Sequence, residues 1–117
     1  MSDEPILECS FFVPTRRDAN LSDGSEHQAE LWDWLDDELF SRFHGGTIAP
    51  KLYDGFYRDP DAKERIADKS YKYFVAVRHG EVDQLRGLLS AVCVLFQQKC
   101  IYLSVAGHVE FIEAPPP

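Results

Sequence analysis

Basic residues and long apolar runs are scarce in this sequence, and their scarcity excludes two classes of partner. The 117 residues include 12 Lys and Arg against 20 Asp and Glu, which gives a formal net charge of -8 at pH 7. A surface of this charge repels nucleic-acid phosphates and anionic lipids, so we expect neither a nucleic-acid nor a membrane partner. No apolar segment approaches the roughly 18 residues needed to cross a bilayer, and the first residues lack the blocks of a secretion signal. These features predict a cytoplasmic protein.

Cysteine and histidine are also few, and neither forms a recognisable pair. The cysteines at positions 9, 93 and 100 are odd in number, form no CxxC motif and have apolar neighbours, as reduced and buried thiols do. The 4 histidines lie in unrelated contexts, without the i, i+2 or i, i+4 partner typical of metal ligands. GxSxG and HExxH motifs are missing as well. We therefore predict no metal site and no cofactor, and hydrolase chemistry has no motif behind it.

The remaining composition is sufficient for one folded domain. Hydrophobic residues make up 44% of the chain and include 2 Trp, 5 Tyr and 8 Phe, more than a disordered acidic chain carries. A chain of this length can bury a core without disulfides or a metal. We predict a single domain over residues 1–114, followed by a disordered proline tail at residues 115–117.

Hydrophobic periodicity predicts a strand and a helix in the first half of the chain. Apolar side chains alternate with period two over residues 6–13, as in a strand packed on one side. They recur at three- and four-residue steps over residues 27–43, as on a helix with one buried face. Ser25 and Gln28 have the spacing of a capping box for this helix, and a Gly45-Gly46 pair is expected to end it. Because phosphate-binding glycines precede a helix, we interpret this pair as a helix end rather than a phosphate site.

The second half reads as two strands, a helix and a last strand. Pro50 cannot donate to a ladder, so residues 47–57 are expected to form an irregular or edge strand. Residues 70–78 alternate clearly and should pair with it in a hairpin with a long tip. A helix is predicted after the His79-Gly80 turn up to about residue 98, and a strand over residues 101–105. Gly107 is expected to mark a bulge before residues 108–112 continue that strand.

This order of elements predicts an α+β fold. Strand, helix, strand, strand, helix, strand is the order of a ferredoxin-like β-α-β-β-α-β sandwich, in which a four-stranded antiparallel sheet carries both helices on one face. The other face of the sheet is expected to hold Phe12, Phe74 and Tyr102. Because exposure of these aromatic side chains to solvent is unfavourable, we expect this face to bind a ligand or to pair two chains in a homodimer.

Polar residues around the hairpin are the best candidates for a ligand site. Arg58 can bind a carboxylate or phosphate with two hydrogen bonds, and Asp68 can orient it or accept a proton. The alternative is structural, with Arg58 and Asp68 paired across the hairpin and Ser70 capping its turn. Gln98 either satisfies helix-end carbonyls or faces a polar ligand near Tyr102. The predicted ligand-binding residues are Tyr57, Arg58, Asp68, Ser70, Gln98 and Tyr102, and no catalytic residue is assigned.

Several short motifs give the chain a likeness to a known family. They are Trp34-Leu35, Phe43-x-Gly45-Gly46-Thr47, Gly55-x-Tyr57-Arg58-Asp59-Pro60, Asp68-x-Ser70, and Phe96-x-Gln98 followed by Ile101-Tyr102-Leu103. With these motifs the chain resembles a family of small, uncharacterised bacterial proteins of ferredoxin-like type. The resemblance is the reason to prefer Gln98 over Gln97 and to group Arg58, Asp68 and Ser70.

Three functions are compatible with these features. The favoured one is a small-ligand-binding or regulatory module, dimeric, with a polar or anionic ligand near residues 55–71. The first alternative is a dimeric α+β barrel-type enzyme, with turnover that depends on Asp68 or Tyr102. The second is a protein-interaction domain without a small-molecule ligand. Whether the protein is an enzyme stays open at this point.

Overall fold

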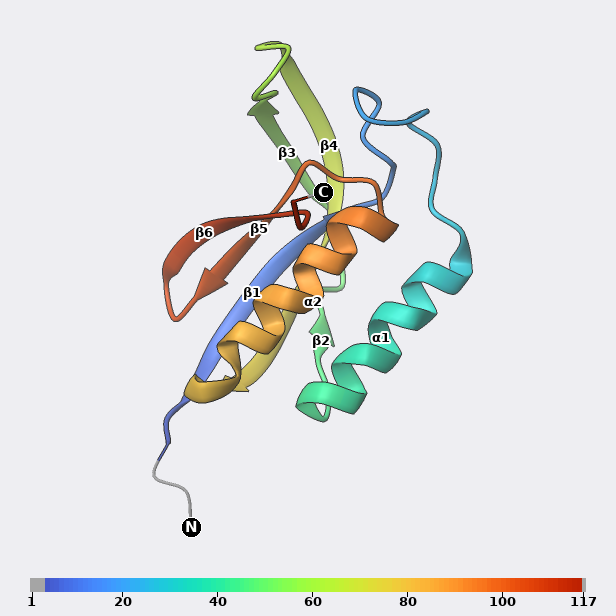
Figure 1. The fold of residues 1–117 in the computed structure, drawn as a ribbon. Helices are drawn as coiled ribbons and strands as arrows, with labels where there is room; N and C mark the ends of the chain where they lie inside the picture. The colour runs from blue at the N-terminus through green and yellow to red at the C-terminus, as the bar shows by residue number, and fades with distance from the viewer. Residues whose placement is uncertain (1–3, 117) are drawn as a thin grey trace.

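The computed structural model describes residues 4–116, which form one antiparallel sheet and two helices (Figure 1). In chain order the elements are β1 (Ile6–Pro14), α1 (Ala29–Phe43), β2 (Thr47–Ile48), β3 (Tyr53–Arg58), β4 (Arg65–Arg78), the 3₁₀ turn η1 (His79–Glu81), α2 (Val82–Leu95), β5 (Cys100–Val105) and β6 (His108–Glu113). Neither described helix is long and apolar enough to span a membrane. Pro115 and Pro116 of the predicted tail are exposed, and residue 117 lies outside the described residues.

The long strand β4 organises the sheet. The strand order is β2-β4-β1-β5-β6, and β3 also pairs with β4. The 14 residues of β4 accommodate both partners on one edge, because β2 pairs at residues 73–74 and β3 at residues 65–70. The β3–β4 hairpin therefore extends beyond the helices, which both lie on one face of the sheet (Figure 1). No helix of residues 4–116 lies on the opposite face.

Strand alternation places the core between the sheet and the helices. Cys9, Phe11 and Val13 of β1 are fully buried, and β4 buries every second residue from Tyr73 to Val77 on the same face. Helix α2 buries six residues along its length, whereas α1 buries only Leu35 and Leu39. Each fully buried side chain of this size stabilises the fold by about 1.5–3 kcal/mol. The helices thus cover one sheet face, and the other face is left for a site.

The prediction of a four-stranded ferredoxin-like sandwich is wrong, because the sheet has six strands. Residues 47–57 do not form one strand. They divide into β2 and β3, and Pro50, which has no N–H for the ladder, lies in the connection. The expected bulge at Gly107 is also wrong. Ala106 and Gly107 both have positive φ angles, 49° and 88°, as in the two-residue turns that reverse a hairpin. The chain therefore turns back, and Val105 pairs with His108 to start β6.

The first helix begins and ends differently from its predicted caps. Gln28 is the N-cap residue and its side chain makes no capping hydrogen bond, while Ser25 bonds to the carboxylate of Asp23 instead. At the other end His44, with φ 68°, takes the left-handed position that was expected of the glycines, and its N–H donates to the Phe40 carbonyl. The three cysteines carry no disulfide.

Candidate functional site

A cavity of about 610 Å³ lies on the sheet face that the helices leave uncovered. Its size falls within the range of small-molecule sites. Strand alternation supplies most of its lining, because the side chains that do not enter the core point to this face. The contributing residues are Phe12 and Pro14 of β1, Tyr53, Gly55 and Tyr57 of β3, Asp68 and Ser70 of β4, Cys100 and Tyr102 of β5, and Phe111 and Glu113 of β6.

Aromatic rings form a continuous wall of this cavity. The ring of Phe12 meets Tyr53 at 5.4 Å and Tyr102 at 5.3 Å between centroids, and Tyr102 meets Phe111 at 5.9 Å. All three contacts are edge-to-face, the geometry that aromatic pairs favour. Flat aromatic side chains of this kind can stack on a heteroaromatic ring.

The charged groups of the cavity are mainly carboxylates. Asp54, Asp68 and Glu113 line it, together with the cations Arg58 and Lys99. The Lys99 ammonium is already held by Asp59 at 3.0 Å and by Asp61 at 2.8 Å. Among residues 4–116 no ion pair involves Arg58. The cavity therefore keeps an excess of negative charge with one available guanidinium.

Asp68 and Tyr57 are two titratable groups whose protonation is altered by burial. Burial raises the pKa of Asp68, a hydrogen bond from Ser70 lowers it, and the charge of Asp18 raises it further. Burial and the nearby Asp18 also raise the pKa of Tyr57, so its phenol stays protonated and donates to Asp18 Oδ2 at 3.5 Å. A half-buried carboxyl with a raised pKa is a candidate for proton transfer.

Gln98 lines the cavity and is held there by two hydrogen bonds. The residue is 4% exposed, and its side-chain Nε2 donates to the carbonyls of Arg16 at 2.8 Å and Phe96 at 2.9 Å. Phe96 follows the last residue of α2, so this amide satisfies a helix-end carbonyl, as one of the two predictions for Gln98 stated. It also joins the helix end to the loop after β1.

The structure brings the six predicted ligand-binding residues, Tyr57, Arg58, Asp68, Ser70, Gln98 and Tyr102, to the lining of this one cavity. The structural alternative of an Arg58–Asp68 pair is not formed within residues 4–116. In the hairpin register Arg58 faces Arg65 and Asp68 faces Gly55, and Ser70 lies inside β4 rather than at a turn. That these residues bind a ligand stays a prediction.

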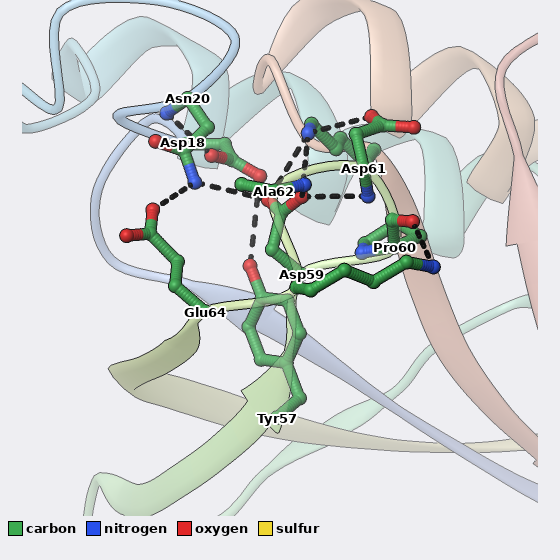
Figure 2. A network of polar contacts seen from close by, with 10 residues as sticks. Asp18, Asn20, Tyr57, Asp59, Pro60, Asp61, Ala62 and Glu64 are labelled. Carbon is green, nitrogen blue, oxygen red and sulfur yellow. Dashed lines mark hydrogen bonds and ion pairs between the residues drawn. The ribbon is translucent and has the colours of Figure 1, made fainter.

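Asp59, between the cavity-lining residues Arg58 and Pro60, is a buried polar residue that sequence reasoning did not select (Figure 2). It is fully buried and accepts hydrogen bonds from the N–H groups of Asp61 and Ala62, both at 2.8 Å, and from Asn20 Nδ2 at 3.0 Å, besides its ion pair with Lys99. These donors hold the pKa of Asp59 well below its usual range, and the N–H of Ala62 has the largest effect. The carboxylate therefore ties the hairpin tip to the β1–α1 loop and to the start of β5.

Part of this network had a signal in the sequence. Asp followed by Pro, as in Asp59-Pro60, is typical of a turn in which the carboxylate accepts N–H groups from residues two or three positions later. The contacts of Asp59 with Asn20 and Lys99 had no such signal, because these residues lie 39 and 40 positions away in the sequence. Phe12 was expected on the open face, whereas Tyr53 and Phe111 were not selected although strand alternation places them beside it.

Comparison with known proteins gives one informative similarity. No family model matches the sequence, and neither does any curated protein. A solved structure described as a phage SAM lyase in complex with S-methyl-5'-thioadenosine superposes with a TM-score of 0.71 over 97% of this chain and 94% of that chain, at 12% identity. At this identity the similarity shows a shared fold. Membership of the bacterial family that the motifs resemble stays an expectation.

Proposed function

We propose that the protein binds a small heteroaromatic ligand in the open-face cavity, and that the ligand is an adenosine thioether such as S-methyl-5'-thioadenosine. The observation that carries this proposal is the aromatic wall formed by Phe12, Tyr53, Tyr102 and Phe111 in a cavity of about 610 Å³. The likeness to a protein whose structure holds this nucleoside supports the choice of ligand.

The charge of the cavity favours a neutral or cationic ligand over the anion considered from the sequence. An anion would face the three carboxylates of Asp54, Asp68 and Glu113. Arg58 is the one cation left to attract it, because the Lys99 ammonium is already neutralised. Repulsion by like charges disfavours that ligand by several kcal/mol when it is close and poorly hydrated. Ribose hydroxyls, by contrast, can donate hydrogen bonds to these carboxylates.

Binding is tested by isothermal titration calorimetry of the wild-type protein with S-methyl-5'-thioadenosine. We expect saturable binding at one site per chain, together with a rise in melting temperature that grows with ligand concentration. Adenosine 5'-monophosphate is the matched comparison, because it keeps the adenosine and adds the disfavoured negative charge. It should bind more weakly. The absence of both heat and a thermal shift for the thioether would reject the proposal.

A second candidate function is catalysis at the same cavity, for which the raised pKa of the half-buried Asp68 is the specific observation. The reaction to test breaks the bond between the sulfur of S-adenosylmethionine and its amino-acid chain. Asp68 takes a proton from the chain carbon next to the one bonded to sulfur, a carbon–carbon double bond forms in the chain, and the electron pair of the broken bond stays on sulfur. S-methyl-5'-thioadenosine and an unsaturated amino acid are the products. Chromatography should detect this product with the wild type and lose it with Asp68→Asn. If the wild type binds the thioether but releases none from S-adenosylmethionine, the protein is a binding module.

We also propose that the chain forms a homodimer through the face that holds the cavity. Large apolar side chains flank the cavity and are exposed there, including Phe111 at 65%, Val109 at 50% and Tyr53 at 42%. A large patch of exposed apolar side chains on one face of a protein commonly marks an interaction surface. A second copy seated on this face would also cover the ligand.

The dimer is tested by measuring the mass in solution. Light scattering should give twice the chain mass of 13.4 kDa for the wild type and a single chain for Val109→Asp, because a charge in this apolar face opposes association. Val94→Asp, on α2 and 56% exposed, is the matched control and should keep the wild-type mass. A wild-type monomer at high concentration would contradict the proposal.

A further inference from the structure

The loop that joins β1 to α1, residues 15–28, is in contact with the site. Its Asp18 accepts a hydrogen bond at 3.5 Å from Tyr57, which lines the aromatic cavity. Its Asn20 donates to the buried carboxylate of Asp59 at 3.0 Å. The position of this loop therefore helps to fix the residues that stand beside the cavity.

His27 closes this loop at its base, just before the start of α1. Its Nε2 lies 2.9 Å from the carbonyl oxygen of Pro14, the last residue of β1. The residue is 9% exposed, and its ring packs edge-to-face against Phe96 at 4.8 Å and Trp32 at 5.5 Å between centroids. His27 thus joins the two ends of the loop to α1 and to the end of α2.

These contacts determine which nitrogen of the neutral ring carries the proton. A carbonyl oxygen can only accept, so Nε2 holds a hydrogen and donates it to Pro14. Nδ1 is then the unprotonated nitrogen, and it is buried without a hydrogen-bond partner within residues 4–116. A second proton has to bind at Nδ1, where it forms a buried N–H group that lacks an acceptor.

The elements packed against the ring contribute aromatic side chains. Trp32 comes from α1 and Phe96 from the end of α2, and Tyr71 of β4 packs on Trp32 at 5.1 Å. Burial among these rings lowers the pKa of His27 and outweighs the hydrogen bond to the backbone carbonyl, which raises it.

The charged groups of the loop do not favour a positive ring either. Arg17 acts on His27 as a like charge and lowers its pKa further. The carboxylates of Asp23 and Glu26 pair with Arg17 and Arg16, and their side chains are 63% and 74% exposed. The imidazolium form of this residue is therefore poorly stabilised where the ring lies.

We propose that the β1–α1 loop is released when His27 gains a second proton. The neutral ring holds the two ends of the loop together, whereas the imidazolium leaves Nδ1–H without an acceptor until the loop moves and admits water. Loop closure is therefore most stable above the ordinary His pKa of about 6.5 and weakens as the pH falls below that value. Because Asp18 and Asn20 belong to this loop, its release would loosen the wall of the cavity in acid.

Hydrogen exchange of backbone amides tests the proposal. The N–H groups of Arg17 and Asp18 report on the loop, because they donate to the carbonyls of Ser25 and Gln97. After correction for the intrinsic exchange rate, we expect their protection in the wild type to fall roughly fivefold or more between about pH 7.5 and about pH 5.5.

Two variants isolate the contribution of the imidazole. His27→Gln does not titrate and its amide can still donate to Pro14, so the fall in loop protection should disappear. His108→Gln replaces an exposed histidine at the start of β6 and should keep the fall. Equal loop protection of the wild type at the two pH values, or an equal fall in wild type and His27→Gln, would overturn the proposal.

A measurement on the wild type alone keeps the test decisive if His27→Gln does not fold. Nuclear magnetic resonance titration of the His27 ring should give a pKa below about 6.5, with the loss of loop protection in the same pH range. A pKa at or above that value would overturn the proposal. Neither measurement needs a ligand, so the result is independent of the proposed function.

Discussion

Replacing Asp59 with alanine is expected to lower the melting temperature by roughly 10 °C or more, since it removes the acceptor of several buried donors and leaves the Lys99 ammonium only the exposed Asp61. The change would leave the Lys99 ammonium, the Asn20 amide and two backbone N–H groups without their shared acceptor. Because this carboxylate joins the hairpin tip to two other segments at the cavity, binding of S-methyl-5'-thioadenosine should weaken as well. Circular dichroism on heating and calorimetry measure the two effects.

Asp61→Ala is the matched control, because Asp61 is the neighbouring carboxylate on the same ammonium but its side chain is 78% exposed. Exposed ion pairs contribute little, so its melting temperature should fall by only a few degrees. Similar melting temperatures for the two variants would contradict a structural role for the buried network.

The dependence of the melting temperature on pH provides a second test of the role of Asp59. Its pKa is lowered in the folded state, so its contribution to stability is complete above the ordinary Asp pKa of about 3.9 and is lost as the pH falls below that value. Asp59→Asn cannot ionise and lacks this contribution at every pH. The difference in melting temperature between wild type and Asp59→Asn should therefore shrink from about pH 6 to about pH 3. A constant difference would show that the charge is not what stabilises the fold.

Replacing Tyr102 with alanine is expected to reduce affinity for S-methyl-5'-thioadenosine by roughly 5- to 150-fold, the range observed when one ring that stacks on a base is removed. Tyr102 lies at the centre of the aromatic wall, between Phe12 and Phe111. Its ring is only half-buried, so the fold should persist. Calorimetric titration measures the affinity, and thermal unfolding confirms that the variant is folded.

Two further variants separate stacking from general damage. Tyr102→Phe keeps the ring and should bind nearly as well as wild type. Phe40→Ala removes an aromatic ring that is 71% exposed on α1, which lies on the other side of the sheet, and should leave affinity unchanged. If Tyr102→Ala binds like wild type, the ligand does not occupy the aromatic cavity.

Local patterns predicted the parts of the fold that depend on neighbouring residues. Period two in β1 assigned Cys9, Phe11 and Val13 to one face, and these side chains are fully buried. The same alternation put Phe12 and Tyr102 on the opposite face, where their rings now meet at 5.3 Å. The apolar repeat in α2 was equally clear, and the helix buries that stripe.

The strand count failed where backbone conformation decided the outcome. Gly107 is compatible with either a bulge or a reversal of the chain direction. The positive φ of the preceding Ala106 cannot be predicted from the residue type, because alanine rarely adopts this conformation. That reversal adds β6, which carries Phe111 to the cavity. A single turn thus changed both the fold and the site.

By itself the sequence determined which side chains share a strand face, because alternation depends only on the backbone geometry of each strand. It also determined the acidic surface. The tertiary structure alone decided that six separate polar and aromatic positions line one cavity, and that Asp59 meets Asn20 across 39 residues of chain. Such contacts depend on strand pairing and loop packing between segments that are far apart in the sequence. A local sequence pattern does not show which of these segments will lie next to each other in the fold.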